Sequence, residues 1–117
     1  MVDTESILTS IKKLLGMDPT FVAFDEDIIM HINSAFSSLS QLGVGPVEGF
    51  SISDAESKWN FFVADNRLNS VRTYVYYKVR LAFDPPATSY AIAAMERMLK
   101  EEEWRLNVQA ETGALNE

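Results

Sequence analysis

Apolar side chains recur three and four positions apart along residues 7–42, the spacing that places them on one face of an α-helix. The first run carries Ile7, Leu8, Ile11, Leu14 and Leu15, and the second carries Ile28, Ile29, Ile32, Ala35, Phe36, Leu39 and Leu42. Gly16 and Gly43 end the two runs. We therefore predict two amphipathic helices, the first capped by Asp3 or Thr4 and the second opened by the acidic turn at residues 25–27.

Residues 43–52, GVGPVEGFSI, combine three glycines and a proline with several apolar side chains, which is typical of an ordered loop. Two interpretations are open. The loop faces a neighbouring protein through Val47 and Phe50, or it folds over the core of its own chain. Beyond it, Ser53 and Glu56 match a capping box, so we predict a short helix that contains Trp59 and ends near residues 65–66.

Residues 68–83, LNSVRTYVYYKVRLAF, fit two periods. Their β-branched and aromatic residues alternate with polar ones, as in a strand. Read as a helix, with Asn69 as its cap, the segment places on one face the residues Leu68, Val71, Val75, Val79 and Ala82. A lone strand between helices would leave its backbone groups without hydrogen-bond partners, so we predict a helix.

Pro85 and Pro86 end that segment, and Thr88 or Ser89 then caps a last helix that we expect to run to about Asn107. On its polar side, oppositely charged residues lie four apart in the pairs Glu96–Lys100, Arg97–Glu101 and Glu101–Arg105. Residues 108–117 carry few apolar side chains, and we predict a disordered tail there.

These elements predict an all-α fold, a single compact bundle of four to five helices with a long C-terminal helix and a flexible tail. A chain of 117 residues is one domain, which we place at residues 1–107. The expected core consists of Ile11, Leu14, Ile32, Phe36, Leu39, Trp59, Phe62, Val75, Val79, Met95 and Leu99.

The formal net charge is −7, which argues against nonspecific wrapping of nucleic acid or binding to an anionic membrane. The charge is segregated: residues 1–57 hold two basic and nine acidic side chains, residues 58–80 hold five and one, and residues 81–117 hold three and seven. There is no cysteine, no apolar run of membrane-spanning length, and an acidic opening where a signal peptide is basic, so we expect a soluble, unexported protein.

The sequence offers no constellation for catalysis. His31 is the one histidine, and it stands beside the apolar stripe without cysteines to complete a zinc site. The acidic turn at residues 25–27 lacks a calcium-binding loop, and the glycines of residues 43–49 miss the spacing of a dinucleotide fingerprint. We expect no enzyme activity, no cofactor and no metal.

Contacts with other macromolecules are the remaining chemistry. Arg72, Tyr76 and Arg80 line up four apart on the predicted helix and indicate a contact with a protein partner. The alternative is a small nucleic-acid-binding module, in which segment 67–80 grips phosphates through Arg72, Lys78 and Arg80. In the last helix Trp104, Arg105 and Leu106 extend past the part that a domain of this size covers, so we expect them to dock on a partner.

Four blocks of the chain together resemble the small head-tail connector, or adaptor, proteins of long-tailed bacteriophages and prophages. They are FDEDIIMHINSAFSSLSQLGVGP at residues 24–46, the Trp59 region, VRTYVYYKVRLAFDPP at residues 71–86, and SYAIAAMERMLKEEEWRLNV at residues 89–108. Their order and spacing are distinctive, although none of them encodes a reaction.

The resemblance implies an all-α bundle that assembles with itself as a cyclic ring of about a dozen copies. It implies as partners the portal protein and the next neck or tail-completion protein, with DNA passing through the ring without tight binding and no contact with a membrane. The expected location is the virion neck, and the host bacterial cytoplasm before assembly. The contact residues of this family form no signature, so the positions named above rest on the residues themselves.

Overall fold

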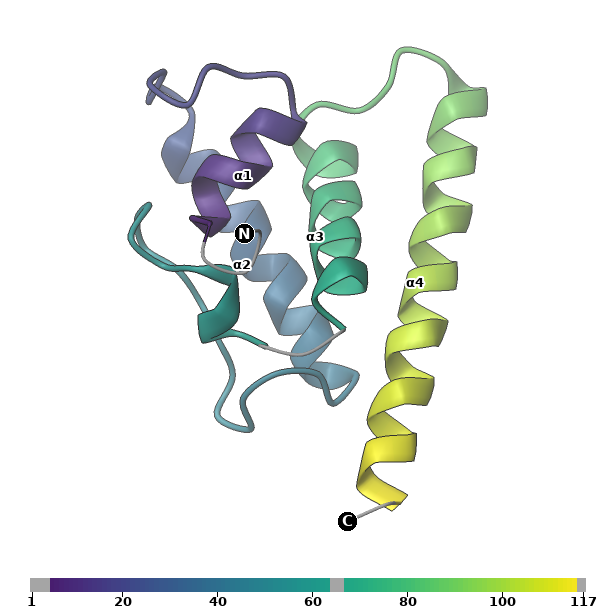
Figure 1. Cartoon of the computed structure of the whole chain (residues 1–117). Helices are drawn as coiled ribbons and strands as arrows, with labels where there is room; N and C mark the ends of the chain where they lie inside the picture. Colours follow the sequence, from purple (N-terminus) through teal and green to yellow (C-terminus); the bar gives the residue numbers. More distant parts are fainter. Residues whose placement is uncertain (1–4, 64–66, 116–117) are drawn as a thin grey trace.

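The computed structural model describes residues 5–63 and 67–115, and within these ranges every regular element is helical. The α-helices are α1 (Ile7–Leu14), α2 (Asp25–Gln41), α3 (Leu68–Phe83) and α4 (Ser89–Leu115), and the 3-10 turn η2 (Trp59–Phe61) lies between α2 and α3 (Figure 1). The all-α prediction is confirmed. Segment 68–83 is a helix, so the strand pattern of its sequence is overridden by its surroundings.

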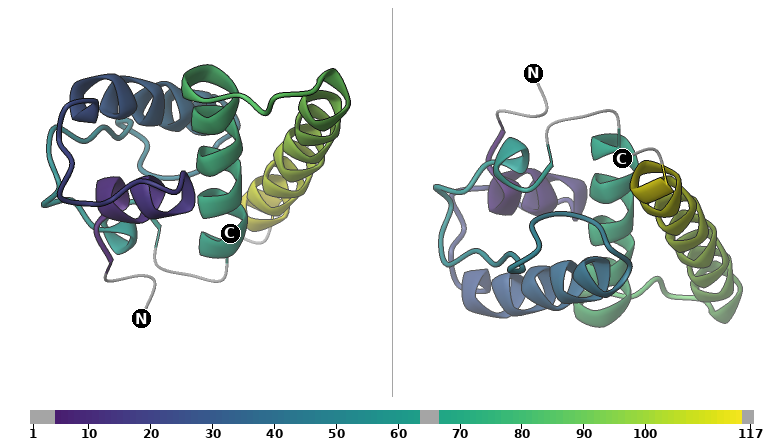
Figure 2. Two further views of the ribbon diagram at one scale, coloured as in Figure 1. Left: turned by 90° about the horizontal axis from the view of Figure 1, so that it is seen from above. Right: turned by 90° about the horizontal axis from the view of Figure 1, so that it is seen from below.

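The helices form two unequal layers about α3. One side of α3 packs against α2, with α1 in front of α2 in this view, and the other side packs against α4 (Figure 1). The views from above and below agree that α4 flanks α3 on the side away from α1 and α2 (Figure 2). None of the described helices combines the length and the apolar character needed to cross a membrane.

The core is centred on Trp59, which comes from the turn η2 and is fully buried. Its indole N–H donates a 2.7 Å hydrogen bond to the Ser10 hydroxyl on α1, and its ring lies 6.2 Å from that of Phe36 on α2. The guanidinium of Arg72 on α3 lies 5.8 Å from the indole centre. Trp59 thus has a partner on each of the helices α1, α2 and α3.

Most of the expected core is confirmed. The members that are buried are Ile11, Ile32, Phe36, Leu39, Trp59, Phe62, Val75 and Val79. Leu14 is wrong: it is 45% exposed, and Leu15 takes its place in the core at the end of α1. Met95 and Leu99 are only partly buried, because α4 packs mainly against a single helix.

Two predicted helix starts are wrong. No helix follows Ser53; Asp54 instead accepts a 2.8 Å hydrogen bond from the Glu56 N–H, and only the single turn η2 forms. Residues 53–56 form bends and a turn, and Lys58 then pairs with Ser6 of the N-terminal segment through an antiparallel bridge. The predicted end of that helix, near residues 65–66, lies outside the described residues.

In α3 the cap is also misplaced. The helix begins one residue before Asn69, whose carbonyl accepts a hydrogen bond from the Thr73 hydroxyl within the first turns.

Two other helix starts are settled by side-chain caps. Ser6 caps α1 by accepting a 3.2 Å hydrogen bond from the Thr9 N–H, while the predicted caps Asp3 and Thr4 lie outside the described residues. Thr88 caps α4 as predicted, with a 3.1 Å hydrogen bond from the Ala91 N–H.

The end of α4 differs from the expectation. The helix does not stop near Asn107 but continues to Leu115, because Leu106 on its inner face is buried and holds this region against the rest of the chain. Residues 108–115 are therefore helical here, and residues 116–117 lie outside the described part of the chain. Disorder of the tail in solution stays a prediction.

Gly45 gives a direct test of this packing. Its φ is +89°, and a Cβ placed there would overlap the ring of Phe62. We expect Gly45→Ala to lower the free energy of unfolding by about 2–4 kcal/mol, the sum of left-handed strain and overpacking. A fall of 1 kcal/mol lowers the Tm of such a domain by roughly 4–8 °C, which a thermal melt measures.

Gly49→Ala is the matched control. Gly49 has a φ of +90° but no atom within 4 Å of the added Cβ, so this variant reports left-handed strain alone, about 1 kcal/mol. Equal melting temperatures for the two variants would contradict the close approach of Gly45 to Phe62.

Candidate partner-binding surfaces

The outward face of α4 carries a row of large side chains that the chain itself does not cover. Tyr90, Arg97 and Trp104 are seven residues apart, and Val108 follows four residues later, so all four lie on one side of the helix. Tyr90 is 84% exposed and Trp104 is 67% exposed. We call these four residues the outer stripe.

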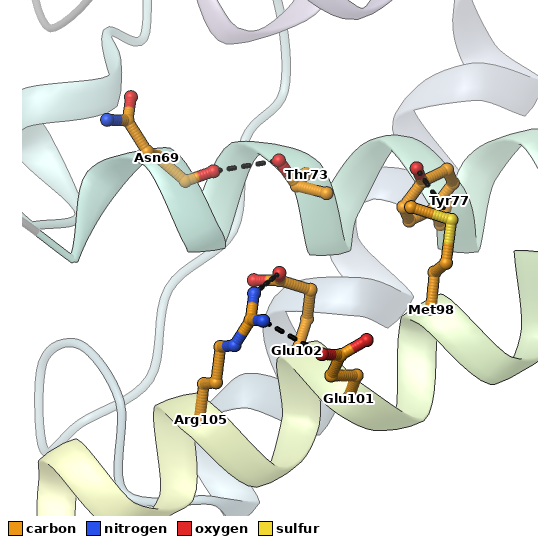
Figure 3. A network of polar contacts seen from close by, with 7 residues as sticks. All are labelled: Asn69, Thr73, Tyr77, Met98, Glu101, Glu102 and Arg105. Atoms are coloured by element: carbon orange, nitrogen blue, oxygen red, sulfur yellow. Dashed lines mark hydrogen bonds and ion pairs between the residues drawn. The ribbon is translucent and has the colours of Figure 1, made fainter.

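The inward face of α4 holds the helix in place. Leu106 is fully buried, and the Tyr74 hydroxyl on α3 donates a 3.1 Å hydrogen bond to the Glu103 carboxylate. Figure 3 shows a second link across the two helices, where the Tyr77 hydroxyl meets the Met98 sulfur. The prediction that Leu106 docks on a partner is therefore wrong: this side chain belongs to the core of its own chain.

Arg105 is engaged within α4. Its guanidinium donates hydrogen bonds of 2.8 and 2.9 Å to Glu101 and Glu102, as Figure 3 shows. The predicted pair Glu101–Arg105 thus forms. The predicted pairs Glu96–Lys100 and Arg97–Glu101 do not form in the part of the chain that the structure describes. Lys100 and Arg97, the two cations beside Trp104, thus have no ion pair among the described residues.

The loop at residues 43–52 is divided between the two interpretations. Val44 and Ile52 are buried, and the Phe50 ring packs 4.9 Å from that of Phe36, so this part of the loop covers its own core. The Asn33 amide fixes the end of the loop by bonding both the N–H and the C=O of Ile52, at 2.7 and 2.9 Å. Only Val47 projects fully into solvent.

The basic and aromatic residues of α3 do line up, and several of them contact other groups of the same chain. Arg72 lies over Trp59, Arg80 donates hydrogen bonds to the Asp84 carbonyl and the Tyr76 hydroxyl, and Lys78 approaches the Tyr74 ring. Arg72 and Tyr76 line a small hollow of about 190 Å³ beside the exposed Leu14. Partner contact through Arg72, Tyr76 and Arg80 stays a prediction.

A further surface was not anticipated from the sequence. The connector between α1 and α2 meets the end of α3 around a cavity of about 560 Å³, lined by Met17, Asp18, Thr20, Phe21, Phe24 and Phe83. Phe24 lies 5.7 Å from Phe21 and 5.7 Å from Phe83, and Phe21 and Phe24 are both about half exposed. We call this cavity the aromatic groove.

A buried lysine holds the connector in the shape that forms the aromatic groove. Lys12 is 1% exposed, and its amine makes a 2.7 Å ion pair with Asp25 and a 2.9 Å hydrogen bond to the Pro19 carbonyl. A lysine in the polar position of a helix is usually solvated, so sequence pattern alone gives no sign of this pair. At the groove rim, hydrogen bonds from Thr20 lower the pKa of Asp18 and favour its charged form.

His31 is partly buried and lies 6.4 Å from the Phe83 ring. Within residues 5–63 and 67–115, no three His, Asp or Glu side chains are grouped so that they could hold a metal ion.

The comparisons with known proteins agree with this all-helical chain. A model of the family described as "Phage connector protein" matches residues 7–113, from the start of α1 into the last turns of α4. The match includes the outer stripe and the aromatic groove. Neither a curated protein nor a solved structure is significantly similar to the chain.

The buried Tyr74 phenol, which links α3 to Glu103 on α4, makes the stability of the fold depend on pH in the alkaline range. Burial and the neighbouring Glu103 carboxylate raise the pKa of Tyr74 to about 12, while the Ser38 hydroxyl acts in the opposite direction. In the unfolded chain the same phenol titrates near 10. The stabilisation is complete below pH 10 and is lost as pH rises towards 12, because only the unfolded chain releases the proton in that window.

We expect the Tm to fall more steeply between pH 10 and 12 in the wild type than in Tyr74→Phe. Absorbance of the phenolate gives the same information, because one of the four tyrosines should titrate late. Tyr90→Phe, at an exposed position, is the control and should behave like the wild type. A single transition near pH 10 for all the tyrosines would contradict the burial of Tyr74.

Proposed function

Because the chain belongs to the phage connector protein family, we propose that it assembles as a ring between the portal of the capsid and the tail. The ring extends the channel through which DNA passes, and it sits in the virion neck after assembly from subunits in the host cytoplasm. The role of the family is structural rather than enzymatic. The family match over residues 7–113 is the observation that carries this proposal.

The distribution of uncovered apolar surface supports a ring. A ring subunit needs two different faces for its neighbours and a further face for the next ring in the assembly. The chain has the outer stripe on one flank and the aromatic groove on the other, and Val47 projects from a third region. Exposed apolar surface of this extent marks interaction sites in soluble proteins.

Trp104 is the main anchor of the proposed contacts, because buried tryptophans dominate the binding energy of protein interfaces. Val47 is the one apolar residue of the loop at residues 43–52 that remains free for the portal or the next neck protein. Phe50 and Arg105 act indirectly, Phe50 by holding the loop and Arg105 by ordering the acidic side of α4.

The net charge of −7 supports a passive DNA conduit, since an acidic channel protein repels phosphates and does not retain the DNA. The alternative, a nucleic-acid-binding module that uses segment 67–80, would be supported by a strand at residues 68–83. The helix α3 forms instead, and it directs Arg72 and Arg80 into contacts within the chain.

The proposal is tested by complementing a phage that lacks this gene. Without the protein we expect DNA-filled heads and separate tails, and with it joined particles that carry a label at the neck, seen by electron microscopy. Trp104→Ala should fold with an unchanged Tm and reduce the yield of joined particles at least tenfold, because loss of an interface tryptophan costs about 2 kcal/mol or more.

Phe61→Ala is the matched control, because Phe61 is an aromatic residue of similar exposure that lies in the turn η2 and not on α4. It should leave the yield of joined particles unchanged. Normal particle assembly in the absence of the gene, or a label found away from the neck, would refute the proposed function.

A further inference from the structure

The outer stripe and the aromatic groove are complementary in charge. Arg97 and Lys100 lie seven and four residues before Trp104, so two cations lie beside the indole on the exposed side of α4. Neither cation has an ion pair among the described residues. The stripe therefore presents an aromatic side chain with unneutralised positive charge beside it.

The aromatic groove has the opposite character. Asp18 lies in its lining, and Glu26 and Asp27 follow Phe24 at the start of α2, where both are exposed. Of the three acids in this turn, Asp25 is neutralised by Lys12, whereas Glu26 and Asp27 have no ion pair among the described residues. One acid therefore lies in the lining and two exposed acids follow within three residues of Phe24, and the cavity of about 560 Å³ has the size of a site for an organic group.

The two surfaces cannot meet within one chain. The connector that forms the groove lies on the side of α1 and α2, while α4 stands on the far side of α3 (Figures 1 and 2). The stripe lies on the exposed face of α4, opposite the buried Leu106. The stripe of one copy can only meet the groove of another.

We propose that the outer stripe of one subunit docks in the aromatic groove of the next, with Trp104 in the cavity and Arg97 and Lys100 against Glu26 and Asp27. The contact joins two different patches, so it is head-to-tail and propagates around a closed ring. This inference rests on the proposed ring and names the faces that form it. Opposite charges at the rim also fix the orientation of the partners and disfavour a symmetric stripe-to-stripe pair.

Disulfide trapping tests the contact directly, because the chain has no cysteine of its own. We expect the full chain with Lys100→Cys and Asp27→Cys together to form, on mild oxidation, a ladder of linked subunits on a non-reducing gel. Each single variant should give no ladder. The pair Lys100→Cys with Ser53→Cys is the matched control, because Ser53 is equally exposed but lies outside the groove.

The experiment is done first on joined particles from the complementation assay, where the label has located the protein. A labelled neck without the ladder would overturn this contact and leave the proposed function standing. If the label is absent from the neck, the proposed function fails, and the purified chain at millimolar concentration is oxidised instead. Absence of the ladder there overturns the contact as well.

Charge reversal separates a specific contact from chance collision. Arg97→Glu with Lys100→Glu should reduce trapping by about tenfold, which corresponds to about 1.4 kcal/mol. Trapping is tracked with Ala93→Cys and Ala23→Cys, two exposed positions beside the stripe and the groove that leave Trp104, the groove lining and the four charges in place. Adding Glu26→Lys and Asp27→Lys to the same chain should restore it. Equal trapping in all the charge variants would refute the complementarity, and circular dichroism of each variant confirms that the helices are intact.

Discussion

The burial of Trp59 is the constraint on which the rest of the fold depends. Three helices of different length and direction converge on one indole, and each supplies a different interaction: a hydroxyl acceptor from Ser10, a ring edge from Phe36 and a cation from Arg72. The residue comes from a segment that has no regular structure beyond one turn, so the irregular stretch between α2 and α3 is as much a part of the core as the helices. The bridge between Ser6 and Lys58 and the hydrogen bonds of Asn33 to Ile52 fix the two ends of the segment that leads to the indole.

Outside that core, the two faces of α4 differ in role: the inner face packs against the rest of the chain, and the outer face is exposed. Its inner face carries Leu106 and Glu103, which accepts the hydrogen bond from the Tyr74 hydroxyl, while its outer stripe exposes large side chains to solvent. A helix that served only its own domain would show polar residues opposite the buried face. The presence of tyrosine and tryptophan there explains why the pattern of this helix is weak, and it is the physical reason to assign the face to assembly.

The sequence predicts elements where the helical spacing is strong and fails where tertiary contacts decide. α1, α2 and the start of α4 follow from apolar periodicity, glycine stops and the Thr88 cap, and the helix at 68–83 follows only from the lack of a second strand. The short helix at Ser53 is wrong because Lys58 pairs with Ser6 and only the turn η2 is helical, and Leu14 is wrong because the helix end turns Leu15 inward. Of the candidate contact residues, Trp104 and Val47 are on the surface as predicted, whereas Leu106 is buried in the core and Phe50 is partly buried against it. The aromatic groove escaped prediction because it joins residues 17–24 to Phe83, and no local pattern links them.

The way α4 is attached has a consequence for the energy landscape of the subunit. Among the described side chains of α4, only Leu106 is a fully buried apolar residue. The linker between α3 and α4 is stiffened by Pro85 and Pro86. Secondary elements with few buried contacts open in native-state hydrogen exchange at a lower free energy than the global unfolding. We therefore expect α4 to open as a separate cooperative unit, with backbone amides that exchange before those of α2 and α3. A molecule that covers its outer face should slow that exchange without changing the core.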